Sequence, residues 1–176
     1  LSRLIDDLLD VGRIQVGKSL GIVLKDEELS CLIKKAVESV AREGTPHDII
    51  IDHKNALPET VCIDGTRITQ VFNNLLHNAI RYSPEGGTIK VQTISDVDRV
   101  TVSIIDQGIG MTPQELEKIF DKFYRASDSK HSSGGFGLGM VIVKQIIEDH
   151  GGEVFVSSAI GDGTTVSFTL PVQQLV

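Results

Sequence analysis

Two asparagines one helical turn apart are the residues whose spacing first suggests chemistry. Asn74 and Asn78 lie in the stretch NNLLHNAIRYS, where apolar residues repeat with a helical period, so both amides fall on one face of a predicted helix. Asparagine is a weak helix former, and two on one stripe cost stability unless something binds there. Amide oxygens suit Mg2+ and amide hydrogens suit phosphate oxygens. The alternative is a polar helix face that only meets solvent.

An acid and two spaced glycines follow a predicted strand at residues 100–105. The segment reads Asp106-Gln107-Gly108-Ile109-Gly110. The carboxylate could accept a hydrogen bond from an exocyclic amine such as N6 of adenine, and the glycines would let the backbone approach a flat base. An ordinary Asp-x-Gly turn is the alternative.

A glycine-rich run precedes another predicted helix, at residues 140–150. It reads GGFGLG over 134–139 and follows a polar stretch, 126–133, that we expect to be a mobile loop. Glycines before a helix N-terminus expose backbone N–H groups to an anion, so a phosphate would fit there. A Rossmann-like dinucleotide loop is disfavoured because no strand leads directly into the run.

The remaining periodicities predict helices gathered on one face of a sheet. The Asn helix should begin at the cap Asp64 and end before Pro84, and Thr112-Pro113-Gln114-Glu115 is a capping box that starts a short helix. A further helix, with Asp26 as its possible cap, should cover 29–40. The expected strands are 22–24, 49–51, 61–63, 89–94, 100–105, 153–157 and 165–170. This pattern predicts an α/β, two-layer sandwich of helices on one face of a mixed, mostly antiparallel sheet.

The first residues form the end of an amphipathic helix. Ile5, Leu8 and Val11 belong to an apolar stripe with no partner nearby in sequence, which is typical of a bundle or coiled coil; packing back on the same domain is the alternative. The sequence starts in the middle of this pattern without Met, so we expect a longer parent chain. Glycines over 12–21 suggest a boundary or hinge.

Composition limits the class of protein. At 176 residues the chain is long enough for one domain, and its net charge of -7, without a Lys/Arg run, argues against a nucleic-acid or anionic-membrane surface. A bound triphosphate would therefore need local cations or a metal. Cys31 and Cys62 stand alone, which argues against a zinc site or disulfide framework and favours a reducing compartment. The sequence contains no long apolar run and no signal peptide.

Together, the motifs resemble the ATP-binding domain of sensor histidine kinases, in the superfamily that also holds gyrase, Hsp90 and the MutL ATPases. The Asn helix, DQGIG, FDKFYR, GGFGLGM and GDGT match the family's asparagine box, first glycine box, phenylalanine box, second glycine box and final glycine-threonine turn in order. The likeness covers about 26–171, and IDDLLD resembles the second helix of the family's dimerisation hairpin. We therefore expect a hairpin-helix end at 1–14, a linker and first strand at 15–25, and an ATP-binding catalytic domain at 26–176.

This resemblance implies a residue-level site for ATP and Mg2+. Asn78 would be the Mg2+ ligand and Arg81 a phosphate contact where the family often has Lys, and these two are the implied catalytic residues. Asp106 would hold the adenine amine, with Tyr82 against the nucleotide. The implied ATP-binding residues are Asn74, Asn78, Arg81, Tyr82, Asp106, Gly108, Gly110, Phe120, Arg125, Lys130, Gly135, Gly137, Leu138, Gly139 and Thr164. For Arg125 and Lys130, a solvated lid charge is the alternative, and His77 is expected to be structural.

The implied reaction is transfer of the γ-phosphate to a histidine. The superfamily's hydrolysing members typically carry a general-base Glu one turn before the metal-binding Asn, where this sequence has Asn74, so hydrolysis should be slow. None of the five histidines has the family's acceptor context, so the acceptor is expected upstream and the chain should bind Mg-ATP without phosphorylating itself.

Partners and location follow from the resemblance alone. They are the phosphoacceptor hairpin of the parent chain, a response-regulator receiver domain that takes the phosphate on an aspartate, and a second copy of the parent in a homodimer. The domain would be cytoplasmic, with a parent that could be anchored in the inner membrane. The alternatives are an ATP-hydrolysing switch of the gyrase, Hsp90 or MutL kind, a non-catalytic nucleotide-binding module, and an anti-sigma serine kinase.

Overall fold

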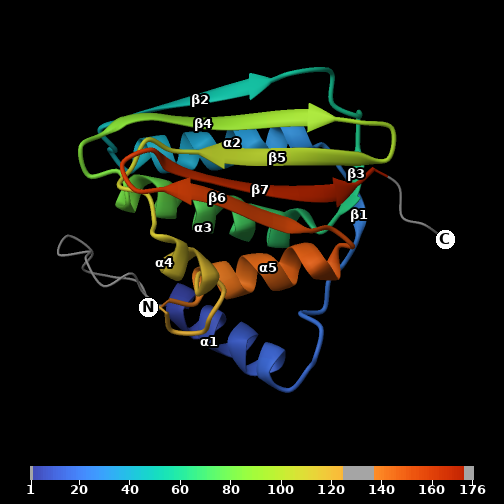
Figure 1. Ribbon diagram of the computed structural model, residues 1–176. Coiled ribbons are helices and arrows are strands. Elements are labelled where there is room, and N and C mark those ends of the chain that lie inside the picture. Colours follow the sequence, from blue (N-terminus) through green and yellow to red (C-terminus); the bar gives the residue numbers. More distant parts are fainter. Residues whose placement is uncertain (1, 125–136, 173–176) are drawn as a thin grey trace.

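A five-stranded sheet lies against a layer of helices in the computed structural model, which describes residues 2–124 and 137–172 (Figure 1). The helices are α1 (Ser2–Gln15), α2 (Leu29–Arg42), α3 (Gly65–Arg81), α4 (Pro113–Glu117) and α5 (Gly139–Asp149). The strands are β1 (Lys25–Glu27), β2 (His47–His53), β3 (Val61–Ile63), β4 (Gly87–Ser95), β5 (Arg99–Ile105), β6 (Val154–Ala159) and β7 (Gly163–Pro171). Within these described ranges, no helix is long and apolar enough to cross a membrane.

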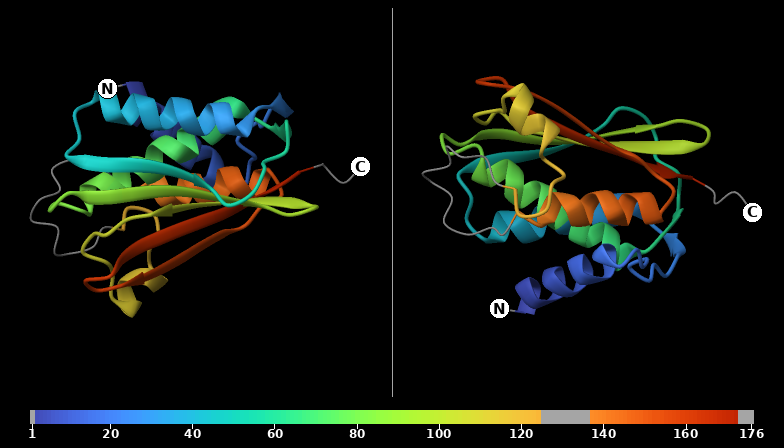
Figure 2. Two further views of the ribbon diagram at one scale, coloured as in Figure 1. Left: turned by 90° about the horizontal axis from the view of Figure 1, so that it is seen from above. Right: turned by 60° about the horizontal axis from the view of Figure 1, so that its bottom comes forward.

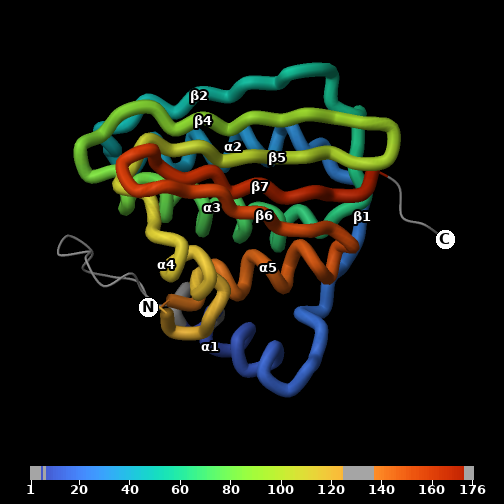
Figure 3. The backbone as a smooth tube through the Cα atoms, in the orientation of Figure 1, coloured from blue at the N-terminus to red at the C-terminus, as the bar shows by residue number. Residues whose placement is uncertain are grey.

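The strands of the main sheet run in the order β2-β4-β5-β7-β6. β2 pairs with β4 in parallel, and each of the other neighbouring pairs is antiparallel. The backbone trace shows β6 and β7 side by side at the sheet edge opposite β2 (Figure 3). The helices α2, α3 and α5 cover one face (Figure 2), so the predicted two-layer sandwich with a mixed, mostly antiparallel sheet is confirmed.

Alternating side chains bind the sheet to the helices. Val100, Val102 and Ile104 on β5 are buried, whereas the residues between them are only partly covered, which is the period-two pattern of a half-buried strand. Phe72 of α3 meets Phe168 of β7 with ring centroids 5.8 Å apart and planes tilted by 60°. This tilted aromatic pair joins the two layers at the centre of the core.

The Asn helix begins where the sequence predicted. The Asp64 carboxylate accepts hydrogen bonds from the backbone N–H groups of Thr66 and Arg67, both at 3.1 Å, and so satisfies two donors that the helix leaves unpaired. The apolar face of α3 is buried through Leu75 and Leu76. A local cap and a long apolar stripe thus fix the helix that carries both asparagines.

Two local predictions near the N-terminus are wrong. The first strand is β1, three residues beyond the expected 22–24, because Lys25 to Glu27 pair antiparallel with β3. The next helix has Glu28 rather than Asp26 at its cap position, and Glu28 makes no side-chain capping bond. Pairing with β3, which is distant in sequence, sets both boundaries, so the local apolar pattern at 22–24 does not.

The segment expected to be a hinge is attached to the domain at Leu20. Its side chain is 1% exposed, its N–H donates to Asp149 of α5 (3.0 Å), and its carbonyl accepts from Arg67 of α3 (3.1 Å). The end of α1 also packs on its own domain, with Val11 3% exposed, whereas Ile5 is 53% exposed. Residues 12–21 are therefore held to the domain at Leu20 and at Ser19, whose hydroxyl also donates to Asp149 (3.0 Å).

Candidate functional site

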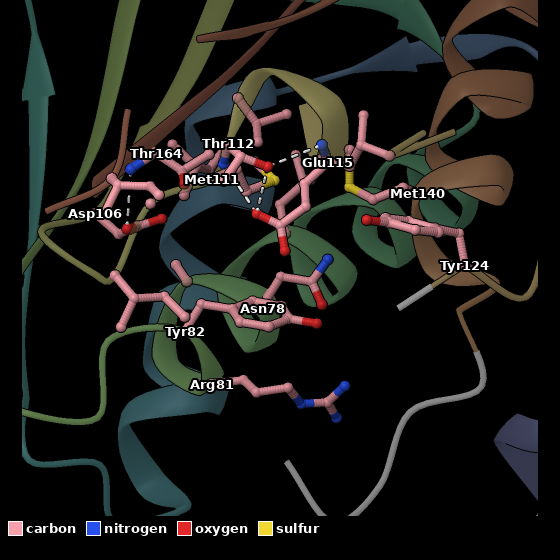
Figure 4. A pocket seen from close by; sticks show the side chains of 18 of the residues that line it. Asn78, Arg81, Tyr82, Asp106, Met111, Thr112, Glu115, Tyr124, Met140 and Thr164 are labelled. Carbon is pink, nitrogen blue, oxygen red and sulfur yellow. Dashed lines mark hydrogen bonds between the residues drawn. The ribbon is translucent and has the colours of Figure 1, made fainter. Parts of the chain in front are cut away.

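A cavity of about 410 Å³ opens between the C-terminal half of α3, the end of β5, α4 and the turn between β6 and β7 (Figure 4). Residues from distant parts of the sequence meet there because β5 ends beside α3 and the chain then crosses over through α4. Seven of the predicted site residues line it: Asn78, Arg81, Tyr82, Asp106, Gly110, Gly137 and Thr164. The structure thus brings together all the motifs except the phenylalanine box, in which Tyr124 is the one described residue that reaches the cavity wall.

Asp106 is the buried acid of this cavity. It is 7% exposed, and its Oδ1 accepts from the N–H groups of Gly108 (2.9 Å) and Thr164 (3.1 Å). Burial raises the pKa of its carboxyl, and these two hydrogen bonds partly offset the rise. Oδ1 is therefore bound to the backbone, and these bonds fix the orientation of the side chain. The carboxylate keeps further acceptor capacity for a ligand.

The two glycines after Asp106 allow the chain to fold closely on itself. A Cβ at Gly108 would lie 2.1 Å from the Tyr82 carbonyl oxygen, and one at Gly110 would lie 1.8 Å from that of Ala159. Gly110 also has φ +69°, a conformation that side chains disfavour. The sequence analysis expected these glycines to make room for a base. The structure shows a further reason for glycine at both positions, which is close contact between the backbone segments that form the cavity wall.

The last turns of α3 supply the polar groups at the other end of the cavity. Asn78 and Arg81 extend from this helix towards the opening, and Tyr82, the residue directly after the helix, also lines the cavity (Figure 4). Asn74, one turn earlier, is 7% exposed, and its amide carbon lies 3.6 Å from where a Cβ of Gly139 would be. Asn74 therefore lies behind the cavity wall, between α3 and the start of α5.

The start of α5 faces these amides, but not every predicted residue there reaches the cavity. Gly137 lines it with φ +68°, and its carbonyl accepts from the N–H of Phe123 (3.0 Å). Leu138 is 1% exposed, so its side chain belongs to the core. Phe120 lies beneath the Lys144 ammonium, 5.2 Å from the ring centroid, and is not a lining residue. The predicted Arg125, Lys130 and Gly135 lie outside the described residues.

The sequence did not single out several side chains that line the cavity. They are Met111, Glu115, Tyr124 and Met140 (Figure 4). Glu115 was predicted only as half of the capping box, which is confirmed: its Oε2 accepts from the Thr112 N–H (2.9 Å) and hydroxyl (3.0 Å). The box fixes the start of α4, but which way α4 faces depends on the path of the chain after β5.

His77 is structural, as expected. Its Nδ1 hydrogen-bonds the Asn73 carbonyl (2.6 Å), and its Nε2 lies 3.0 Å from a Glu43 carboxylate oxygen. Both ring nitrogens are thus engaged away from the cavity.

The donor set suits a metal held mainly by a bound phosphate group. Among the side chains that the structure describes, no group of three or more His, Cys, Asp or Glu could hold a metal ion. Asn78 nevertheless offers a neutral amide oxygen at the cavity, and Mg2+ is commonly bound by one or two protein oxygens together with substrate phosphates and water. The residues present therefore fit Mg2+ arriving with a nucleotide.

Comparison with known proteins gives consistent matches. The profile of the family described as "Histidine kinase-, DNA gyrase B-, and HSP90-like ATPase" matches residues 63–174. The sensor histidine kinase WalK of Bacillus subtilis (strain 168) is 41% identical over 115 residues, 64% of this chain and 19% of its own. The adaptive-response sensory kinase SasA of Synechococcus elongatus is 33% identical over 175 residues, 98% of this chain and 44% of its own.

Among solved structures, a mycobacterial sensor histidine kinase, MprB, has a TM-score of 0.74 and 30% identity. The match covers 87% of this chain and 100% of that one. This chain spans less than half the length of the two curated relatives.

Proposed function

Because the chain belongs to the histidine kinase-, DNA gyrase B- and HSP90-like ATPase family, we propose that its cavity binds Mg-ATP and that it donates the γ-phosphate to a histidine on an upstream helical hairpin. One observation carries this proposal. The cavity has a buried, oriented carboxylate, Asp106, at one end, and an amide, a guanidinium and a glycine-lined helix start at the other. That polarity matches a nucleotide, which has an amine-bearing base at one end and a triphosphate at the other.

At the base end, Asp106 accepts from the adenine amine with an oxygen not required by the backbone. Tyr82 and the apolar side chains of Ile109 and Met111 lie along the flat base. The fixed orientation of the carboxylate lowers the entropy lost on binding.

At the phosphate end, Arg81 and the N-terminal backbone of α5 provide positive potential. Asn78 would hold Mg2+ through its amide oxygen, with Asn74 close behind it. When bound, Mg2+ neutralises charge on the phosphates. The residues of this chain align and screen the triphosphate, and such positioning supplies most of the catalysis in phosphoryl transfer.

Transfer to histidine is favoured over hydrolysis because of Asn74. An amide cannot take a proton from water at neutral pH. Among the described residues that line the cavity, the two acids are Asp106 and Glu115, and each is already bound to backbone N–H groups. The γ-phosphate therefore persists until an imidazole approaches it.

The wider assignments rest on the relatives. We assign 1–14 to the end of the hairpin helix, 15–25 to the linker and first strand, and 26–176 to the catalytic domain. The relatives are named as sensor kinases. The partners we propose are the acceptor hairpin, a second copy of the parent chain and a response-regulator receiver domain that takes the phosphate. We also propose that the domain works in the cytoplasm, as part of a parent chain that could be anchored in the inner membrane.

Calorimetric titration of ATP with and without Mg2+, followed by a free-phosphate assay on the same sample, tests the proposal. We expect binding that strengthens with Mg2+, intact ATP and no phosphohistidine on this chain. A chain extended upstream through the hairpin should then form phosphohistidine. Steady phosphate release would support an ATPase instead, and absence of binding would refute the assignment of the cavity.

A further inference from the structure

A closed set of hydrogen bonds joins the end of α1 to the start of α3. Arg67 donates from Nη1 and Nη2 to the two carboxylate oxygens of Asp10, at 2.7 and 3.2 Å. Gln70 donates to Asp10 (3.2 Å) and accepts from Arg67 (2.9 Å). The Arg67 side chain is 20% exposed and that of Asp10 is 7% exposed. A two-pronged, largely buried ion pair has a defined geometry, unlike a surface pair between flexible side chains.

The same arginine also holds the connection that follows α1. Its Nη2 donates to the carbonyl of Leu20 (3.1 Å), while the N–H of Leu20 donates to Asp149 at the end of α5. Thus α1 and the connection after it are bound to both α3 and α5 through Arg67 and Asp149. If the domain rotates about the segment 12–21, this cluster must either act as the pivot or lose its hydrogen bonds.

The cluster lies at the end of the molecule away from the cavity. α3 runs from Arg67 to Asn78 over eleven residues, or about 16 Å at the helical rise. α1 passes beneath α5, with its N-terminal end towards the side from which α5 starts (Figures 1 and 2). α1 therefore begins on the side where α5 starts and where Gly137 and Met140 line the cavity, whereas Asp10 and Arg67 join the two parts at the opposite end.

From this arrangement we propose that Arg67, through Asp10, is a positioning residue for phosphoryl transfer: it fixes the orientation of the nucleotide-binding domain on the hairpin helix. This inference rests on the proposed function. A fixed contact at one end limits the range of orientations in which the cavity can approach a histidine on the upstream hairpin. Positioning of this kind raises the rate of transfer without altering the affinity for the nucleotide.

The test compares Arg67→Gln with wild type in a chain extended upstream to include the hairpin. At saturating Mg-ATP we expect phosphohistidine formation to slow about tenfold or more, with the ATP dissociation constant unchanged within about twofold. Arg67→Lys keeps the charge without the fork and should fall between the two. The matched control is Arg42→Gln, which removes the exposed pair with Glu38 (3.5 Å) and should leave the rate unchanged.

A distance measurement on this chain separates failure of this contact from failure of the proposed function. Spin labels at Leu8→Cys on α1 and Val97→Cys on the β4–β5 turn, both exposed positions, are introduced after replacing Cys31 and Cys62 with alanine. We expect one narrow distance distribution in the parent and a broad one with Arg67→Gln.

Three results would overturn the inference: an unchanged distance distribution in Arg67→Gln, a faster transfer rate, or a loss of rate matched by a loss of ATP affinity. If the extended wild-type chain forms no phosphohistidine, the proposed function fails, and the distance distributions still decide whether the pair orients the domain.

Discussion

Replacing Asp106 by asparagine should separate nucleotide recognition from folding. Asn has the same shape, and its amide oxygen can accept the two backbone bonds that Asp106 receives from Gly108 and Thr164. Its NH2 group would then face the adenine amine, so two donors meet where an acceptor is required. The protein should still fold, because the pKa of Asp106 is raised in the folded state and ionisation of this buried acid costs the native state free energy.

The expected loss of affinity follows from the bonds involved. A hydrogen bond to a charged acceptor contributes about 1.5–3 kcal/mol, and a buried unsatisfied donor costs about 1–3 kcal/mol. We take about 3 kcal/mol in total, which corresponds to a dissociation constant for ATP about 150-fold weaker. Guanine carries an oxygen in place of the adenine amine, so the Asp106→Asn variant should also lose most of its preference for ATP over GTP.

Titration calorimetry with ATP and GTP, together with a thermal melt, measures both effects. The matched control is Asp52→Asn, because Asp52 lies on β2, away from the cavity, and pairs with Lys54 (2.7 Å). An Asp106→Asn variant that folds normally and binds ATP within about threefold of wild type would refute the assignment of the base to this carboxylate.

Three further results are expected. Asn74→Glu places a carboxylate one turn before Asn78 and should raise free-phosphate release at least about tenfold, whereas Asn74→Gln should not. Gly110→Ala places a Cβ 1.8 Å from a carbonyl oxygen and should cost more than about 3 kcal/mol of unfolding free energy in urea; Gly161→Ala has a similar φ, +82°, but open space, and should cost only about 1–2 kcal/mol. Because burial raises the pKa of Asp106, acidification from neutral pH should protonate it before the exposed acids and weaken ATP binding, and the Asp106→Asn variant should lose this dependence in the same titration.

Short-range signals predicted the elements that carry the site. The Asp64 cap and the Thr112 capping box are each complete within four residues, and both are present as predicted. The alternation of Val100, Val102 and Ile104 likewise fixed the buried face of β5. Such signals act through local backbone geometry, so they do not depend on contacts with residues distant in sequence.

The failures involve partners distant in sequence. β1 lies at Lys25–Glu27 because of its pairing with β3, and the parallel pairing of β2 with β4 has no local pattern. The sequence included Tyr124 only as part of the phenylalanine box FDKFYR, and its place in the cavity wall depends on its contact with Gly137. The buried pair of Asp10 and Arg67 joins residues 57 positions apart, and charge patterning within one helix does not reveal it.

The hydrogen bond from Phe123 to Gly137 has a consequence for engineering. It brings together the two ends of the interval 125–136, so whatever chain connects them starts and finishes at fixed points. Closing a loop costs free energy that grows only slowly with its length, so doubling the number of residues between two fixed ends adds about 0.6 kcal/mol. A reporter peptide or a second small domain could therefore be inserted between these two ends at little cost to stability.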